Sequence, residues 1–175
     1  MIISVERFKE FIPGIKDSDP VIEAKLKAVE LLIRKHTNNN FQNRGIRFKC
    51  RIMTGKLWLS TDMLLVGDTI QISESMYSKG VYTIVSKEDG FIELDEMLFD
   101  ETEVLLTKVE YPVDVVLGAV NMMKWDLENR DKVGVQSETI SRHSVTYFNM
   151  DGDNSSMGYP KSLLGFLKPY MKARF

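Results

Sequence analysis

The spacing of apolar side chains follows a helical period near both ends of the chain. A first helix is predicted to begin after Ser4 as its N-cap and to end near Pro13. A second helix is predicted with Asp19 as its N-cap and Pro20 at its first helical position. The asparagines of the segment TNNN are expected to end this helix in the left-handed conformation. Its core stripe consists of Ile22, Leu26, Val29 and Ile33.

From Ile46 the period changes to two, which predicts a β-strand. In the segment IRFKCRIM, apolar residues alternate with three basic residues, Arg47, Lys49 and Arg51, which should share the outer face. Turn residues separate the further predicted strands. These are Lys56–Leu59, Thr69–Ser73, Val81–Lys87, Phe91–Leu94 and Val104–Val109. Short strands at this spacing predict a small β-barrel, closed or nearly closed, of the SH3-like type.

A third helix is predicted to begin at Tyr111-Pro112 and to end near Asn129. Most of its positions are apolar, so most of its circumference should be covered. Each large apolar side chain left in water forgoes about 1.5–3 kcal/mol. Because two other helices can hardly surround it, we expect the β segment or a second subunit to cover it. The residues expected at a subunit contact are Val116, Val120, Met123 and Leu127.

The segment 134–159 shows no clear period and is predicted to be a long loop involved in assembly, because such connections are usually functional or disordered. A last helix is predicted from Lys161 to about Leu167, and Pro169 should end or kink it. The fold class predicted is therefore α+β. A helical module of about four helices, residues 1–43 and 111–175, would carry an inserted β-barrel of residues 44–110.

Composition narrows the class of protein. The net charge of −2 and the pI near 5.8 argue against a dedicated nucleic-acid binder, which usually has a strongly basic domain. The apolar runs are too short to cross a bilayer, so no membrane partner is expected. The N-terminus does not resemble a secretion signal. The single cysteine, Cys50, cannot form an internal disulfide, which fits synthesis in a reducing cytoplasm.

No arrangement of reactive residues predicts an active site. His36 and His143 are distant in sequence and have no cysteine beside them, so neither is expected to hold zinc. The segment MDGDNSSMG resembles the start of a calcium-binding loop, but serines stand where that loop requires glycine and glutamate. The acidic segment ELDEMLFDETE is interleaved with apolar residues and is expected to be a solvated strand edge and turn. We therefore expect no enzymatic activity, no metal and no cofactor.

Charge is unevenly distributed along the chain. No acidic residue lies between Asn38 and Thr61, where the basic strand is predicted, whereas the sign reverses from Glu88 to Glu110. The basic strand face could contact nucleic acid or an acidic partner. It could also protect a strand edge from pairing, or meet the acidic segment of a neighbouring subunit in a ring. The residues alone leave these interpretations open.

Four stretches of the chain together resemble the head-tail connector (head completion or adaptor) proteins of long-tailed phages. VIEAKLKAVELLIRKHTNNNFQ is similar to the first long helix of that family, which ends in an asparagine-rich cap, and YPVDVVLGAVNMMKWDLENRD to its central apolar helix. VGVQSETISRHSVTYF resembles its SE-x-I-x-x-x-S-V-x-Y loop, and YPKSLLGFLKPYMKARF its C-terminal helix. Some members lack a β insert, so the barrel would be an elaboration of a helical module.

The resemblance implies a structural protein of the virion neck, made in the host bacterial cytoplasm. Family members form a ring, generally dodecameric, beneath the portal protein. The ring extends the DNA channel and provides the platform for the next neck protein or the tail completion protein. Genomic DNA passes through it without sequence-specific binding.

The resemblance also suggests which residues make contacts between proteins. Those expected in the loop that reaches a neighbouring subunit or the portal are Ser137, Glu138, Ile140, His143 and Tyr147. Those expected in the C-terminal contact are Tyr159, Pro169 and Tyr170. The alternative function is a nucleic-acid-binding module that uses the SH3-like barrel and its basic strand.

Overall fold

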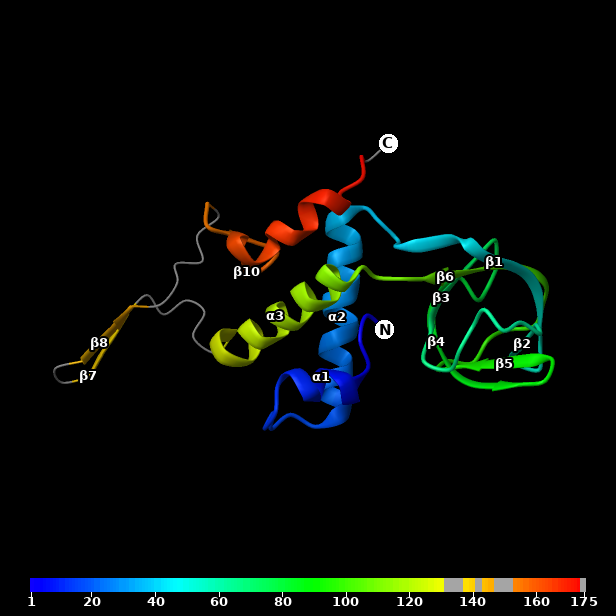
Figure 1. The fold of residues 1–175 in the computed structure, drawn as a ribbon, viewed down its shortest axis with the longest axis horizontal. Coiled ribbons are helices and arrows are strands. Elements are labelled where there is room, and N and C mark those ends of the chain that lie inside the picture. Colours follow the sequence, from blue (N-terminus) through cyan, green and yellow to red (C-terminus); the bar gives the residue numbers. More distant parts are fainter. Residues whose placement is uncertain (131–136, 141–142, 147–152, 174–175) are drawn as a thin grey trace. The chain divides into compact units, whose positions relative to one another are not determined.

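The computed structural model describes residues 1–130, 137–140, 143–146 and 153–173 (Figure 1). The described residues form an α+β protein with four helices and a closed antiparallel β-barrel. The chain makes two compact units. The barrel unit consists of residues 1–4 and 40–111, and the helical unit consists of residues 5–39 and 112–175.

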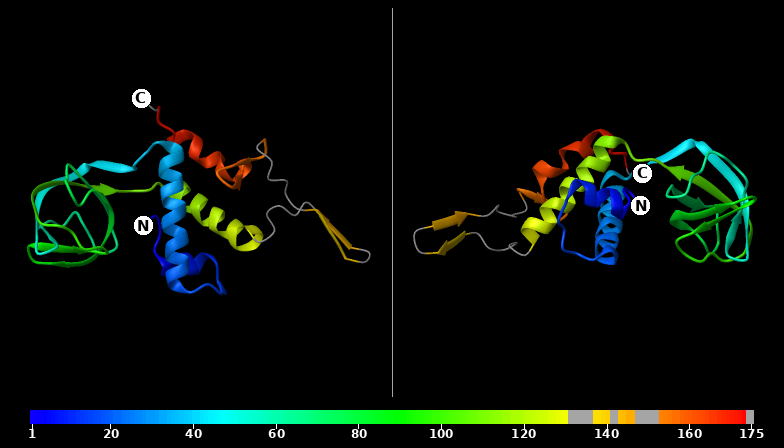
Figure 2. Two further views of the ribbon diagram at one scale, coloured as in Figure 1. Left: turned by 180° about the vertical axis from the view of Figure 1, so that it is seen from behind. Right: turned by 60° about the horizontal axis from the view of Figure 1, so that its bottom comes forward.

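Six strands close the barrel in the order β1-β2-β5-β4-β3-β6, and β6 pairs with β1 (Figures 1 and 2). The strands are β1 (Gln42–Met53), β2 (Lys56–Trp58), β3 (Thr69–Ser73), β4 (Gly80–Glu88), β5 (Phe91–Leu94) and β6 (Glu101–Val109). The small barrel predicted from the sequence is confirmed at this level. β1 begins earlier than predicted, because a register shift between Asn43 and Arg47 interrupts the alternation there.

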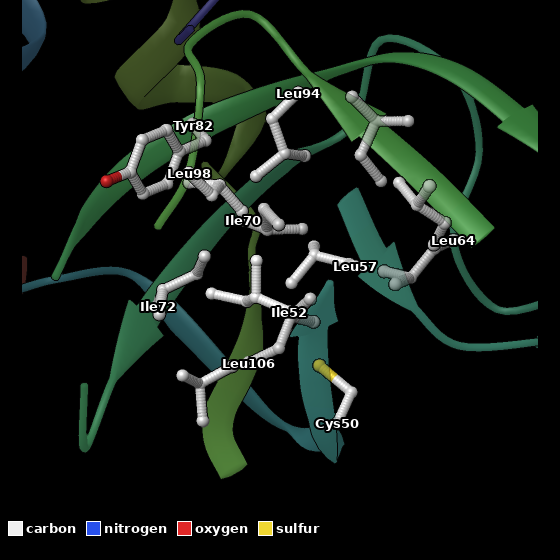
Figure 3. Close-up of a cluster of buried hydrophobic side chains, with 13 residues drawn as sticks. Cys50, Ile52, Leu57, Leu64, Ile70, Ile72, Tyr82, Leu94, Leu98 and Leu106 are labelled. Atoms are coloured by element: carbon white, nitrogen blue, oxygen red, sulfur yellow. The ribbon is translucent and has the colours of Figure 1, made fainter. Parts of the chain in front are cut away.

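Side chains from all six strands fill the barrel (Figure 3). In β1, Cys50 and Ile52 are buried while Lys49 and Arg51 are exposed, as the alternation predicted. Residues of two loops, Leu64 and Leu98, complete this cluster. The other buried members of the cluster are Leu57, Ile70, Ile72, Tyr82, Ile84, Ile92, Leu94, Val104 and Leu106.

The first four residues belong to the barrel unit, although the sequence pattern placed them with the helices. Ile2 and Ile3 are buried. Thr69 at the start of β3 donates a hydrogen bond from Oγ1 to the carbonyl oxygen of Met1 at 3.0 Å. The apolar pair could have belonged to either unit, and only the tertiary contact decides between them.

The helical unit contains α1 (Val5–Phe11), α2 (Asp19–Thr37), α3 (Val113–Asn129) and the 3-10 helix η2 (Lys161–Tyr170). Ser18, rather than the predicted Asp19, is the N-cap of α2, and its side chain makes no capping hydrogen bond. At the other end, Asn38 adopts the left-handed conformation with φ 49° and ψ 34°, as predicted. Within the described residues, no helix is both long enough and apolar enough to span a membrane.

α3 packs against both α2 and η2 (Figure 1). Tyr170, the last residue of η2, places its hydroxyl 2.8 Å from Oδ1 of Asp114 at the start of α3. η2 continues past Leu167 through Pro169, contrary to the predicted end near Leu167. Proline removes only one N–H donor there, and its fixed φ of about −65° suits a 3-10 turn.

The segment 134–159, predicted as a loop, contains short strands in its described residues. β7 (Ser137–Ile140) pairs antiparallel with β8 (His143–Thr146), and β9 (Ser155–Ser156) pairs with β10 (Tyr159–Pro160). Strands of two to four residues are too short to show a period in the sequence.

Candidate assembly surfaces

The stretch that resembles the loop motif of the connector family contains the β7–β8 hairpin. Ser137, Glu138 and Ile140 lie on β7, opposite Thr146, Val145 and His143 respectively. The two halves of the motif are therefore brought together by backbone pairing. Tyr147, the remaining predicted contact, lies outside the described residues.

Tyr159, predicted as a C-terminal contact, is a core residue of the helical unit instead. Its side chain is buried, and its hydroxyl donates a hydrogen bond to Oδ2 of Asp126 at 2.8 Å. Burial, followed by the hydrogen bond to Asp126, raises the pKa of Tyr159. Its ring lies 5.6 Å from that of Trp125, and Arg130 lies over both rings. The burial of Tyr159 assigns it a packing role in this unit and gives no support to the predicted contact with another protein.

Pro169 and Tyr170, the other predicted C-terminal contacts, differ in their surroundings. Pro169 is exposed. Tyr170 is half-buried, and its backbone carbonyl accepts a hydrogen bond from Asn39 Nδ2 at 3.2 Å. The hydroxyl bond to Asp114 raises the pKa of Tyr170. Tyr170 thus joins η2 to the start of α3 and to Asn39, which follows α2, and of the two residues only Pro169 is exposed.

The helix α3 is covered within its own unit to a greater extent than the sequence predicted. Val120 and Met123, two of the proposed subunit contacts, are buried by the packing of α2 and η2. The argument that one chain cannot cover these positions is therefore wrong. Val116 and Leu127 are half-buried and remain partly accessible.

A second apolar stripe is exposed on α2, on the side that does not face the core. Val21, Ala24, Ala28 and Leu31 are all exposed. They recur at intervals of three and four residues, so they lie along one face of the helix. Sequence reasoning assigned only the buried stripe of this helix and missed the exposed one.

The basic residues of β1 lie on the outer surface of the barrel. Lys49 Nζ is 2.8 Å from Glu103 Oε1, and the hydrogen bond to Glu103 raises the pKa of Lys49. Arg47 Nε donates to Thr107 Oγ1 at 3.1 Å. β6 pairs with β1 along most of its length, whereas β2 pairs only with Arg51, Ile52 and Met53 at its end. Arg47 and Lys49 therefore lie where the described pairing covers only one side of β1, and the interpretation of their charges as edge protection stays open.

Two aromatic rings beside this basic face make cation–π contacts. The guanidinium carbon of Arg51 lies 5.2 Å from the ring centre of Trp58, which is exposed. Lys56 Nζ lies 4.4 Å from the ring centre of Phe91, and Lys56 is also ion-paired with Glu93. Such contacts contribute about 0.5–1 kcal/mol at exposed sites. Of these two cations, only Arg51 has no carboxylate partner among the described residues.

One end of the barrel carries large apolar side chains that are exposed to solvent. The β1–β2 turn, the β3–β4 loop and the β5–β6 loop all lie at this end, because neighbouring strands are antiparallel. Met97 is 91% exposed and Met76 is 78% exposed. Tyr77 and Phe99 are each 66% exposed, and their ring centres lie 6.2 Å apart. We call these four residues the tip cluster.

Hydrogen bonds hold the two loops that carry the tip cluster. The carboxylate of Glu101 accepts a bond from Ser75 Oγ at 2.6 Å and bonds from the N–H groups of residues 76–78 at 2.8–3.3 Å. These bonds, the one from Ser75 above all, lower the pKa of Glu101. The buried Ser78 joins the loops, because its Oγ accepts a bond from the Phe99 N–H at 3.0 Å.

Carboxylates border the tip cluster. Glu74, Glu96 and Asp100 are exposed on the same two loops, which also carry the basic residue Lys79. The pKa of Tyr82 is raised first by burial and then by neighbouring carboxylates, Glu96 the foremost. This end of the barrel therefore combines apolar surface with negative charge.

Sequence reasoning did not identify the tip cluster. It assigned ELDEMLFDETE to a solvated strand edge and residues 78–80 to a turn. The available signal was the presence of large apolar residues directly beside turn residues, where a small barrel has no room to bury them.

Cys50, the single cysteine of the chain, lies in the core of the barrel. Its thiol is buried in the barrel core, and burial raises its pKa to about 11. A thiol with so high a pKa carries almost no thiolate at neutral pH, so Cys50 is a packing residue.

Comparison with known proteins does not assign the chain to a family. No protein-family model matches it. No curated protein sequence is significantly similar to it.

Proposed function

We propose that this protein is a structural head-tail connector (head completion) protein of a phage neck. It forms a ring beneath the portal, extends the DNA channel and provides the platform for tail attachment. In this proposal its partners are further copies of itself, the portal protein and the next neck or tail completion protein, and it acts in the virion.

One observation carries this proposal: the stretches that resemble the connector family belong largely to one compact unit. The family-like segments contain α2, α3, the β7–β8 hairpin and η2, all assigned to the helical unit. α2, α3 and η2 pack together, and the segment that follows η2 is also bound to α2, because the Lys172 N–H donates to the Thr37 carbonyl oxygen at 2.8 Å. The barrel strands contribute almost nothing to the resemblance. A helical module with an inserted barrel is the arrangement that the resemblance implies.

The exposed stripe of α2 supports a contact between identical copies. Its four apolar residues are left in water by the chain's own packing, and exposed apolar surface of this kind favours association. In the proposed ring this stripe replaces the buried positions of α3 as the principal subunit contact. Val113 and Leu117, exposed on α3, add to the apolar surface of the helical unit.

The barrel is assigned in this proposal to the SH3-like type. The support is its small size and its consecutive antiparallel hairpins β1–β2, β3–β4 and β4–β5. In the ring it is an elaboration of the helical module.

The hairpin provides the direct test of the connector function. A deletion of residues 137–148 removes β7 and β8 and leaves the barrel strands and all four described helices in place. The deleted protein should retain its circular dichroism spectrum and lose attachment to portal-bearing capsids that lack this protein. The intact chain, assayed on capsids without portal, is the control and should not attach. Attachment of the folded deletion variant would contradict the role of the hairpin.

Mass measurement tests the ring itself. The free protein at low micromolar concentration should be largely monomeric, and mixing it with portal should give a ring-shaped complex of defined mass. Val21→Ser with Leu31→Ser should weaken ring formation, because these changes remove apolar area from the α2 stripe. A complex of one copy per portal assembly would contradict the proposal.

A second candidate function is the binding of single-stranded nucleic acid by the barrel. The observation that favours it is the exposed ring of Trp58 with Arg51 over it, because aromatic rings beside cations stack on bases. The pairing of Lys49 and Lys56 with carboxylates reduces the charge available. This function predicts oligonucleotide affinity that falls steeply with salt and weakens on Arg47→Glu with Arg51→Glu. Salt-independent or undetectable binding would exclude it.

A further inference from the structure

The tip cluster exposes apolar side chains on loops that the fold already holds in place. The carboxylate of Glu101 fixes the backbone of residues 76–78, and Ser78 fastens this loop to Phe99. Preorganised side chains lose less conformational freedom on binding, which favours association. Methionine and aromatic residues are also the types enriched at the centres of protein interfaces. The tip cluster therefore has the character of a binding surface.

The charge around the tip cluster indicates which class of molecule it can bind. The bordering carboxylates of Glu74, Glu96 and Asp100 would repel the phosphates of nucleic acid and the head groups of anionic lipids. A protein surface with arginine or lysine would instead be attracted, and complementary charge orients such contacts. The partner should present apolar area together with positive charge.

A surface with this chemistry lies on the same barrel, along the outer face of β1. Arg44 and Arg51 are exposed and have no carboxylate partner among the described residues. Arg51 lies beside the exposed ring of Trp58, which supplies apolar area. We call Arg44, Arg47, Arg51 and Trp58 the β1 face.

We propose that the tip cluster of one copy docks on the β1 face of a second copy. The inference deepens the proposed function and rests on it, because it names a contact between neighbouring ring subunits. The loops of the tip cluster are held to the barrel that also contains β1, so the tip cannot fold back onto its own β1 face. A contact between two different surfaces is head-to-tail and repeats from copy to copy, which closes into a ring when the rotation allows.

Sedimentation velocity of the whole protein measures this contact. At low salt, the wild-type chain should self-associate reversibly between about 10 μM and about 1 mM. Met76→Ser with Phe99→Ser should raise the dissociation constant at least about tenfold. The matched control is Met63→Ser with Leu65→Ser, which removes apolar residues of similar exposure from the β2–β3 loop at the other end of the barrel. This control should associate like the wild type.

A charge exchange separates a specific contact from general stickiness or misfolding. Glu96→Arg and Arg51→Glu should each weaken self-association, because each opposes like charges across the contact. An equimolar mixture of the two variants should associate more tightly than either alone, since both pairings between the two variants regain opposite charges: Arg at position 96 meets Glu at position 51, and the unchanged Glu96 meets the unchanged Arg51. The gain should shrink as salt rises from about 50 mM to about 300 mM.

Three results would overturn the inference. They are a wild-type chain that stays monomeric to about 1 mM, a tip variant that associates like the wild type, or a mixture that shows no rescue. Each of them leaves the connector function standing if the capsid attachment assay succeeds. Failure of that assay with intact tip-to-β1 association would instead reject the connector function and keep the contact.

Discussion

Gly118 offers the sharpest test of how the helical unit is packed. A Cβ built at Gly118 on α3 would lie 2.5 Å from Cε1 of Phe166 in η2 and would overlap the ring. Ordinary carbon–carbon contacts are about 3.5–4.0 Å, so the ring would have to move by about 1 Å or more. Phe166 is half-buried, so it can move only by giving up its packing against α3.

Two opposing effects set the size of the change in Gly118→Ala. Alanine favours a helix over glycine by about 0.8–1.0 kcal/mol. Overpacking of a well-filled site costs about 1–3 kcal/mol. We therefore expect Gly118→Ala to lower the free energy of unfolding of the helical unit by about 1 kcal/mol. In a Phe166→Ala background the clash is absent, and the same substitution should stabilise the unit by about 0.8–1.0 kcal/mol.

Urea unfolding followed by tryptophan fluorescence gives the measurement. The chain has two tryptophans, and Trp58→Phe leaves Trp125 of α3 as the reporter of the helical unit. Gly165→Ala is the control, because a Cβ at Gly165 meets no atom within 4 Å. A coupling free energy of about 2 kcal/mol between positions 118 and 166 is expected. If Gly118→Ala stabilises the wild-type chain as much as the Phe166→Ala chain, the ring does not lie against this glycine and the packing of η2 on α3 is wrong.

Three further predictions concern titratable groups. Because the folded-state pKa of Glu101 is lowered below its ordinary 4.5, its contribution to stability is present above that pH and is lost as the pH falls through the folded pKa. In Glu101→Gln the free energy of unfolding of the barrel should therefore fall less steeply as the pH is lowered, and amide exchange at residues 76–78 should be faster. An unchanged dependence of the unfolding free energy on acidic pH would contradict this. The Cys50 thiol, with its pKa near 11, should react with a thiol reagent at pH 8 only as fast as the barrel opens, so labelling faster than barrel unfolding would refute its burial. Tyr159→Phe should cost about 1 kcal/mol by urea unfolding, because Asp126 loses a hydrogen-bond donor. Because the pKa of Tyr159 is raised in the folded state, the stabilisation by this hydrogen bond should be full below about pH 10 and should decrease as the pH rises toward the folded-state pKa. If Tyr159→Phe lowers the free energy of unfolding equally at every alkaline pH, this reasoning is contradicted.

Local patterns were sufficient to predict most of the secondary structure. The alternation in IRFKCRIM predicted which β1 side chains enter the core, because side chains of a strand point to opposite faces in turn. The asparagine after α2 was identifiable as a left-handed cap, because few other residues tolerate that conformation. The hairpin β7–β8 was not predicted, because four-residue strands leave too little sequence for a period.

The identity of the residues on the candidate surfaces depended more strongly on tertiary structure than the secondary structure did. The apolar character of α3 was plain from the sequence, but its partners were not. Val120 and Met123 were expected at a subunit contact, and they are buried because α2 and η2 both pack on this helix. Tyr159 was likewise expected at a protein contact and is held in the core by Asp126. A residue's hydrophobicity indicates that it will be covered, and it does not indicate by which segment.

The sequence by itself determined the order and type of the main elements, because helical and strand periods and turn residues act over short distances. Only the tertiary structure decided that β1 closes the barrel between β2 and β6, that the first four residues join the barrel unit, and that Met76, Tyr77, Met97 and Phe99 gather at one end of the barrel. Those features depend on contacts between residues far apart in the chain, such as Ser78 with Phe99. Periodicity carries no information about such contacts, because it reports only which side of one element is apolar.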